Sequence, residues 1–143
     1  MVSTDLITLT DPRSNAAEAF RTLRTNLMFS SVEKPIHTLL VTSTSKADDK
    51  SIALANLAVT FAQAGNKTIL VDSDMRQPMQ HTIWGIGNER GLSNMMLDDT
   101  LLSNPPLQKT DVDNLLVVPS GQQPPNPADV LSSQRMNDII GVL

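Results

Sequence analysis

The stretch LLVTSTSKADDKS at residues 39–51, together with the apolar run over residues 52–64, decides the fold of this chain. The pattern predicts a short buried strand, a polar loop that ends in Lys50 and Ser51, and a helix that stops at Gly65. A helix N-terminus attracts anions, and a lysine beside it adds a positive charge. The stretch therefore has the layout of a phosphate-binding loop.

The loop lacks the glycines that such a site normally needs. In a P-loop, successive backbone amides turn toward the phosphates with φ values that side chains resist. Lys50 and Ser51 stand where a lysine would contact phosphate and a hydroxyl would ligate magnesium, but Asp49 precedes them in place of glycine. The Asp49 carboxylate would repel a bound polyphosphate, because two like unit charges 4 Å apart repel by about 4 kcal/mol at an effective dielectric of 20. The loop alone thus leaves open a phosphate site or an ordinary capped helix.

Two carboxylates follow the next predicted strand, an apolar run over residues 67–71. Asp72 stands at the carboxyl end of this strand, where parallel sheets bind ligands, and Asp74 comes two residues later. Residues i and i+2 of an extended segment point the same way, so we expect both to converge on one hard cation or its waters. One of them could also accept a proton from an attacking hydroxyl. A solvated turn is the alternative, and the neighbouring P-loop-like stretch favours the site.

The remaining patterns predict alternating strands and helices, which indicates a three-layer α/β fold with a mainly parallel sheet. Alternating apolar residues suggest a weak strand over residues 6–9. The strand before the polar loop is predicted over residues 37–43, and a further strand is predicted over residues 115–118. A loop over residues 119–127 contains four prolines and should be stiff.

Three helices besides the one after Lys50 are expected. Asn15 is the predicted N-cap of the first, with Glu18 as its capping-box partner, and this helix should last to about Ser30. Its predicted apolar face consists of Ala16, Phe20, Leu23 and Leu27. A short helix should begin near residues 90–93, and the last helix should run over residues 128–143.

Composition narrows the class of protein. The chain has 143 residues, a net charge of -4 and no cysteine, which argues against a nucleic-acid surface and against a disulfide framework. No apolar stretch is long enough to span a bilayer, and the first ten residues lack the basic residues of a signal peptide. We therefore predict a soluble, intracellular protein. Because the chain ends on the apolar run 139–143, we interpret residues 1–143 as one domain that stops before at least one more strand.

Taken together, the motifs resemble the cytoplasmic domain of bacterial tyrosine kinases (BY-kinases) of the CapB/CpsD type, which are P-loop proteins. The resemblance covers residues 11–143. It is carried by the Walker A′ segment at residues 69–78, then by His81, Trp84, Gly85, Asn88 and residues 91–93, 118–121, 124–129 and 132–133. It implies a P-loop NTPase-like fold and an ATP-dependent autokinase that phosphorylates tyrosines of neighbouring subunits. It also implies a role in the synthesis and export of capsular or exopolysaccharide.

The same resemblance assigns the site. Lys50 is expected to contact phosphate, Ser51 and Asp74 to hold magnesium, and Asp72 to serve the metal and to position or deprotonate the acceptor phenol. Arg76 belongs to the same motif. The residues expected around ATP and Mg²⁺ are Thr44, Ser45, Lys46, Ala47, Asp48, Asp49, Lys50, Ser51, Ile52 and Arg76.

The resemblance also implies partners. Its Glu-x-x-Arg-x-x-Arg motif matches Glu18, Arg21 and Arg24, which in the family is associated with ring-like self-assembly. An ion pair on an exposed helix face, with i,i+3 spacing, is the simpler interpretation of the residues themselves. Such kinases also pair with a membrane-embedded activator, so a place in the cytoplasm at the inner face of the plasma membrane is expected.

The sequence departs from the family in ways that keep other functions open. Ala47 and Asp49 replace two loop glycines, Ile52 replaces a threonine, and the Walker B strand and the tyrosine cluster are absent. The first alternative is a non-catalytic subunit of a polysaccharide-export assembly. The second is a switch ATPase of the MinD/ParA type, which is disfavoured because Ser45 stands where that class has a signature lysine. A fragment or an altered sequence is a further alternative.

Overall fold

Among the residues that the structure describes, three strands form a sheet at the centre of the molecule. The computed structural model describes residues 6–31, 33–45 and 49–143. The strand order is β1 (Thr68–Val71), β3 (Leu115–Val118) and β2 (Gln108–Lys109). β1 and β3 are parallel, with Thr68 opposite Leu115 and Val71 opposite Val118, whereas β2 pairs antiparallel with β3. The two strands that the sequence predicts here are confirmed, and β2 is an addition.

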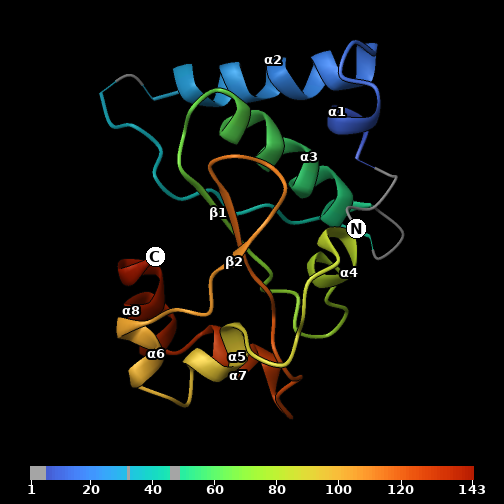
Figure 1. Cartoon of the computed structure of the whole chain (residues 1–143). Helices are drawn as coiled ribbons and strands as arrows, with labels where there is room; N and C mark the ends of the chain where they lie inside the picture. Colours follow the sequence, from blue (N-terminus) through green and yellow to red (C-terminus); the bar gives the residue numbers. More distant parts are fainter. Residues whose placement is uncertain (1–5, 32, 46–48) are drawn as a thin grey trace.

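Helices cover both faces of this sheet, which confirms the three-layer α/β class (Figure 1). The helices are α1 (Ile7–Thr10), α2 (Asn15–Phe29), α3 (Lys50–Gln63), α4 (Gln80–Trp84), α5 (Leu92–Met95), α6 (Thr100–Ser103), α7 (Pro127–Leu131) and α8 (Gln134–Val142). Helices α2 and α3 lie on one side, and α5 to α8 lie on the other (Figure 1). Among the described residues, no helix has the length and apolar character needed to cross a bilayer.

Alternation along the strands divides the apolar interior into two cores. Leu70, Leu115 and Val117 pack with α3 on one face. Ile69 and Val71, which flank Leu70 on β1, pack instead against the cluster built by α5, α6 and α8. Successive side chains of a strand point to opposite faces, so a continuous apolar strand can be buried on both sides.

The predicted helix after Lys50 is confirmed as α3. It ends where the sequence indicates, because Gly65 adopts φ of +87°, a left-handed conformation that glycine adopts without strain. Two polar side chains, Asn56 and Thr60, are buried in this helix. Both are hydrogen-bonded, as buried polar groups must be to avoid a desolvation penalty.

The strand predicted at residues 6–9 is wrong, because this segment forms the one-turn helix α1. Thr8 donates two hydrogen bonds to Asn56 Oδ1, from its backbone amide at 3.0 Å and its hydroxyl at 2.8 Å. Leu6 is fully buried beside α3. A tertiary anchor on α3 thus overrides a weak local alternation.

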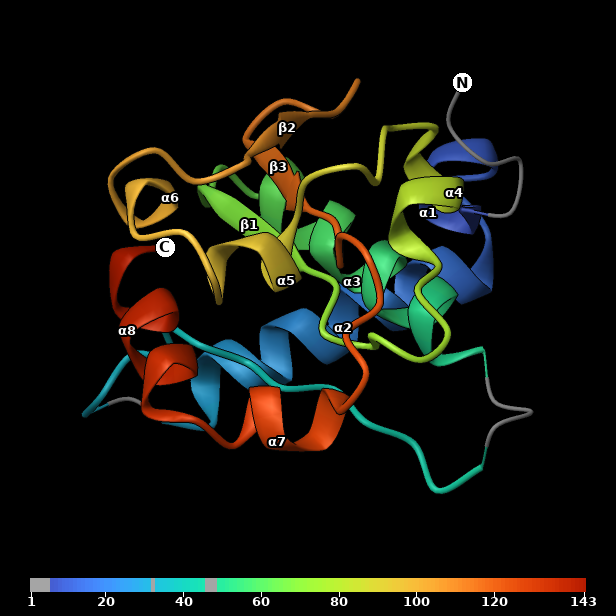
Figure 2. The ribbon, with the colours of Figure 1, turned by 90° about the horizontal axis from the view of Figure 1, so that it is seen from below.

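The strand predicted at residues 37–43 is also wrong: the structure assigns no strand there. An extended segment becomes a strand only when a neighbour supplies hydrogen bonds, and none of the described strands pairs with this one. Leu39 is 39% exposed and Leu40 is 80% exposed. Figure 2 shows the strands in the order β2, β3, β1, with this teal segment beyond β1.

Helix α2 lasts as long as predicted, but its start and its buried face differ. Ser14, not Asn15, is the N-cap, and its hydroxyl accepts a hydrogen bond from the Ala17 amide at 3.1 Å. Glu18 pairs with Arg21 instead of closing a capping box. The predicted face is wrong in part, because Ala16 and Leu23 are exposed while Ala17 is fully buried. Phe20 and Leu27 are half-buried as predicted, whereas Ala17 and Arg24 take the places expected for Ala16 and Leu23.

The single C-terminal helix predicted at residues 128–143 is two helices, α7 and α8, with a break at Ser132 and Ser133. The Ser133 hydroxyl donates to the Val130 carbonyl at 2.7 Å, and the Ser132 hydroxyl donates to the Asp129 carbonyl at 3.2 Å. Serine side chains that bond to nearby carbonyls compete with helical hydrogen bonds. This competition explains why the helix stops here.

Candidate functional site

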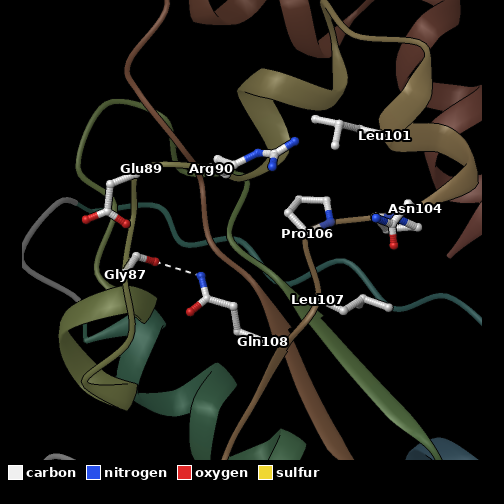
Figure 3. Close-up of a pocket in the computed structure, with 9 residues that line it drawn as sticks. Gly87, Glu89, Arg90, Leu101, Asn104, Pro106, Leu107 and Gln108 are labelled. Carbon is white, nitrogen blue, oxygen red and sulfur yellow. Dashed lines mark hydrogen bonds between the residues drawn. The ribbon is translucent and has the colours of Figure 1, made fainter.

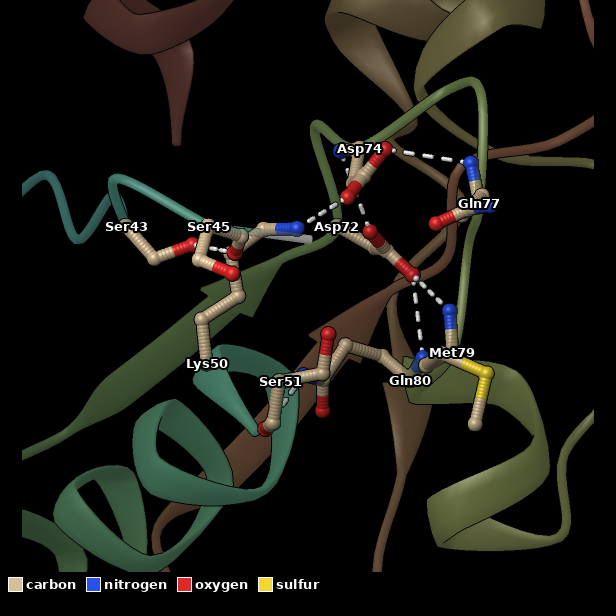
Figure 4. Close-up of polar contacts among 9 residues, drawn as sticks. All are labelled: Ser43, Ser45, Lys50, Ser51, Asp72, Asp74, Gln77, Met79 and Gln80. Carbon is tan, nitrogen blue, oxygen red and sulfur yellow. Dashed lines mark hydrogen bonds and ion pairs between the residues drawn. The ribbon is translucent and has the colours of Figure 1, made fainter. Parts of the chain in front are cut away.

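Lys50 and Asp74 meet at the carboxyl end of β1 (Figure 4). Lys50 begins α3, and its Nζ lies 2.5 Å from Asp74 Oδ2. Asp74 Oδ1 accepts a further hydrogen bond from the Gln77 amide at 3.1 Å. The structure therefore brings together two groups that are 24 positions apart and that the sequence assigns to one site.

The ion pair controls the acidity of Asp74. Partial burial by itself raises the pKa of a carboxyl group, but here the hydrogen bond and charge of Lys50, with the Gln77 amide, outweigh that effect. The pKa of Asp74 therefore lies below its usual value. The carboxylate remains ionised near neutral pH and can serve as a ligand for a hard cation.

Asp72 lies deeper than Asp74 and is only 4% exposed. Its Oδ1 accepts a hydrogen bond from the Asp74 amide at 3.2 Å, and its Oδ2 accepts from the Met79 and Gln80 amides at 3.0 Å each (Figure 4). Burial raises the pKa of Asp72, against the opposing effect of these amides. In this arrangement its carboxylate bonds to the amides at the start of α4 and closes the turn after β1.

The predicted nucleotide loop is described only in part. Lys46, Ala47 and Asp48 lie outside the described residues. Thr44, Ser45 and Asp49 are exposed, and so is the more distant Arg76. Asp49 precedes α3 with φ of -76° and makes no side-chain capping bond. Ser51 and Ile52 are half-buried in the first turn of α3, where Ile52 packs against the core.

Gln80 lies at the centre of the site, although the sequence pattern did not mark it as a site residue. Its amide Nε2 donates to the Ser51 carbonyl at 2.9 Å, and its Oε1 accepts from Trp84 Nε1 at 3.1 Å. Its backbone amide is one of the donors to Asp72. The available signal was its spacing: Gln80 precedes Ile83 and Trp84 by three and four positions on an apolar helix face.

The motif residues after α4, Asn88 and residues 91–93, hydrogen-bond to the segment that follows β3. The Asn88 side chain bonds to both backbone polar groups of Gly121. Its Oδ1 accepts from the Gly121 amide at 2.9 Å, and its Nδ2 donates to the Gly121 carbonyl at 3.2 Å. The Leu92 amide donates to the Pro119 carbonyl at 2.8 Å. These contacts fasten the segment after β3 to the start of α5, so this motif supports the fold beside the site.

The Glu-x-x-Arg-x-x-Arg residues make contacts within the chain. Arg21 pairs with Glu18 at 2.8 Å and also donates to the Pro12 carbonyl. Arg24 donates from Nη1 to the Thr60 carbonyl at 2.9 Å, and this bond joins α2 to α3. Among the three, Glu18 is exposed, while the two arginines are half-buried.

A separate surface groove of about 330 Å³ lies beside β2 (Figure 3). Its lining residues are Gly87, Glu89, Arg90, Leu101, Asn104, Pro105, Pro106, Leu107 and Gln108. Gln108 Nε2 donates to the Gly87 carbonyl at 2.8 Å across one end. The predicted site residues that fall within the described ranges do not line this groove.

The oxygen donors at the end of β1 suit a hard cation such as magnesium. In the part of the chain that the structure describes, no group of three His, Cys, Asp or Glu side chains gathers into a metal cluster. Magnesium usually binds through one or two carboxylates together with substrate phosphates and waters. Asp74 and the Ser51 hydroxyl offer oxygen ligands of this kind.

Comparison with known proteins gives close relatives. No family model matches the sequence. The chain is 45% identical over 132 residues to the putative tyrosine-protein kinase CapB of Staphylococcus aureus, covering 92% of this chain and 58% of that protein. It is 38% identical to the tyrosine-protein kinase YwqD of Bacillus subtilis, covering 94% of this chain and 56% of that protein. The chain thus spans little more than half of these relatives.

A solved structure shares the fold. The crystal structure of the chimerical protein CapA2B2 superposes with a TM-score of 0.87 at 36% sequence identity. The match covers 96% of this chain and 60% of that chain. The two layers of helices around a mostly parallel sheet are therefore the arrangement of a known domain.

Proposed function

The chain belongs to the bacterial tyrosine kinase (BY-kinase) family, and on this premise we propose that it contributes an ATP and Mg²⁺ site to a protein-tyrosine autokinase. The process served is the synthesis and export of capsular or exopolysaccharide. The observation that carries the proposal is the meeting of Lys50 with Asp74 at the carboxyl end of β1. Phosphoryl transfer depends mainly on positioning and charge stabilisation, which a lysine and a carboxylate at one strand end can supply.

Each site residue has a distinct proposed role. Lys50 neutralises charge that develops on the transferred phosphoryl group, while Ser51 and Asp74 hold the metal ion. Magnesium supplies charge neutralisation between the phosphates when it is bound. Asp72 is the proposed acceptor of the phenol proton, a role for which a raised pKa is suitable. Because its oxygens bond to three backbone amides, the turn after β1 must move for a phenol to reach it.

A non-catalytic role in the same export assembly is the second candidate. The observation that favours it is Asp49, an exposed carboxylate directly before Lys50 where a phosphate loop needs close approach of backbone. Repulsion between Asp49 and a polyphosphate opposes binding. In this alternative the domain keeps its fold and its partner surfaces without turnover.

Titration with Mg-ATP separates the two candidates. We would measure affinity by calorimetry for the parent chain, for the Ala47→Gly, Asp49→Gly double variant, and for Lys50→Met in each background. We expect the double variant to bind at least about tenfold more tightly than the parent, because it loses a charge and two side chains. Lys50→Met should abolish binding in both.

The results distinguish the candidates as follows. If the parent binds and Lys50→Met does not, the nucleotide site is supported. If only the double variant binds, the non-catalytic candidate is favoured. If neither binds, or if binding survives Lys50→Met, the proposed site is wrong.

Partners are proposed from the same premise. We propose that the face of α2 carrying Glu18 and Arg21 mediates self-association, and that a membrane-embedded activator holds the domain at the inner face of the plasma membrane. Arg24 belongs to the same motif, but its bond to Thr60 also fastens α2 to α3. An Arg21→Glu variant tests the surface best, and its mass by analytical ultracentrifugation should fall toward that of one chain. An unchanged mass for an associating parent would exclude this surface.

A further inference from the structure

Gln80 connects three separate parts of the candidate site (Figure 4). It is the first residue of α4 and is only 2% exposed. Its side chain reaches the first turn of α3 through the Ser51 carbonyl, while its backbone amide reaches Asp72 after β1. The distances are 2.9 Å and 3.0 Å. One residue therefore joins the lysine-bearing helix to the carboxylate-bearing turn.

The side-chain amide of Gln80 is hydrogen-bonded through both its nitrogen and its oxygen. Its Oε1 accepts the indole N–H of Trp84, one turn later in α4, at 3.1 Å. Trp84 is itself buried and packs in the core with α3. A glutamine with free rotamers would hold nothing in place, but one whose oxygen is bonded to a packed indole presents its Nε2 in a single direction.

We propose that Gln80 is a positioning residue that fixes the first turn of α3, and with it Lys50 and Ser51, relative to the turn of Asp72 and Asp74. The effect of Gln80 on Mg-ATP binding rests on the proposed function. Its effect on the position of α3 concerns the free protein and does not depend on that function. The Ser51 carbonyl lies in the same helical turn as Lys50. A donor bonded to that carbonyl therefore constrains where the ammonium group of Lys50 can reach.

A purely space-filling role for Gln80 makes different predictions. A side chain that only fills volume can be replaced by methionine, which has nearly the same shape and no hydrogen-bonding amide. A positioning role requires the amide itself. The Gln80→Met variant therefore separates the two roles.

Hydrogen exchange of the free protein tests the tether. We expect Gln80→Met to speed amide exchange about tenfold at residues 53–55, whose amides bond to the carbonyls of the first turn, with exchange in α8 unchanged. Trp84→Phe removes the indole donor that orients the Gln80 amide but retains the amide itself, so exchange at residues 53–55 should rise less than in Gln80→Met. Gln108→Met, which removes a similar glutamine bond to the Gly87 carbonyl, is the matched control.

Three results would overturn the tether. The first is unchanged exchange at residues 53–55 in Gln80→Met. The second is an equal increase throughout the chain, which would indicate only a general loss of stability. The third is a larger increase in Trp84→Phe than in Gln80→Met, which would show that the indole, and not the bond from the Gln80 amide to Ser51, holds the first turn of α3.

Mg-ATP affinity tests the functional part. We expect Gln80→Met to weaken binding about tenfold and Gln108→Met to leave it unchanged. Equal affinity of the Gln80→Met variant and the parent would overturn the functional part. If the parent itself binds no Mg-ATP, the proposed function fails while the exchange results still decide whether Gln80 holds α3.

Discussion

At the scale of single residues, the pair of Lys50 and Asp74 sets the geometry of the candidate site. Both side chains are half-buried, and solvent therefore screens part of their attraction. The ion pair matters more for orienting the Lys50 side chain than for the free energy of unfolding. It points the Lys50 ammonium toward the carboxyl end of β1, where phosphate would have to bind.

The low pKa of Asp74 predicts an acid-dependent loss of stability. A carboxyl group with a depressed folded pKa stabilises the protein above its unfolded pKa, near 3.9, and loses that effect as the pH falls through the folded pKa. We expect Asp74→Asn to reduce the decline in unfolding free energy below pH 4, by less than about 1 kcal/mol because the pair is half-exposed. Urea unfolding between pH 6 and pH 2.5 measures it.

The raised pKa of Asp72 acts in the opposite direction in the same experiment. Ionisation of the buried Asp72 carboxyl group opposes folding. The free energy of unfolding that depends on this group therefore falls as the pH rises from the unfolded pKa, about 3.9, through the folded pKa of Asp72. The effect of Asp74 must therefore be isolated by comparing variants. Asp113→Asn, at an exposed position, is the control. If both substitutions change the decline in unfolding free energy below pH 4 equally, the role of Asp74 is contradicted.

Gly91 is a position that no side chain can share. A Cβ there would lie 2.1 Å from the Pro119 carbonyl oxygen and 2.4 Å from the Gly121 amide nitrogen, and both are backbone atoms. We expect Gly91→Ala to reduce the free energy of unfolding by about 2 kcal/mol or more, as overpacking does. Gly141→Ala is the matched control, because it meets nothing within 4 Å in α8 and should stabilise that helix slightly. Equal effects of the two substitutions would disprove the steric argument.

At the scale of elements, α1 exists because of one buried amide on α3. Asn56 Oδ1 accepts from both the amide and the hydroxyl of Thr8, while its Nδ2 donates to the Ile52 carbonyl at 2.9 Å. All three contacts satisfy a polar group inside the core. A four-residue helix is unstable alone, so its conformation depends on this anchor.

Thr8→Val tests the anchor. It retains the shape of the side chain and removes only the hydroxyl donor, so we expect the unfolding free energy to fall by about 1 kcal/mol. Thr25→Val is the control, because the Thr25 hydroxyl is exposed and bonds to the Arg21 carbonyl of its own helix. Urea unfolding of both variants gives the comparison. A loss for Thr25→Val as large as for Thr8→Val would contradict the anchor.

At the scale of the whole molecule, one edge of the sheet stands out. Within the described ranges β1 pairs only with β3, and the Thr68 and Asp72 amides bond on that side. Because amides alternate along a parallel strand, those of Ile69 and Val71 face the other edge. Beyond that edge lies the segment over residues 37–43, as Figure 2 shows, in which Leu40 is 80% exposed. An open strand edge next to exposed apolar side chains favours association.

We therefore expect reversible self-association at high protein concentration, and we expect Leu40→Lys to reduce it. A lysine beside a strand edge opposes edge pairing through charge and solvation. Sedimentation velocity across a concentration series measures the effect. Leu97→Lys is the matched control, because Leu97 is 91% exposed but lies after α5. An equal reduction by both substitutions would show that general charge, not this edge, is responsible.

The sequence by itself determined the elements whose patterns are strong and local. The apolar run of α3 with Gly65 at its end, and the mainly apolar strands β1 and β3, carry their conformation in residue type and period. The meeting of Lys50 with Asp74 was also expected from the motif pattern, although the strand predicted before Lys50 at residues 37–43 does not form. These features needed no knowledge of distant contacts.

Only the tertiary structure decided the rest. Whether residues 6–9 formed a strand or a helix depended on Asn56, nearly fifty positions away, and residues 37–43 formed no strand because a strand needs a partner in space. The role of Gln80 was equally hidden, since each of its bonds joins a different element. Hydrogen bonds between distant residues satisfy buried polar groups, and a local pattern carries no information about which distant group will be there.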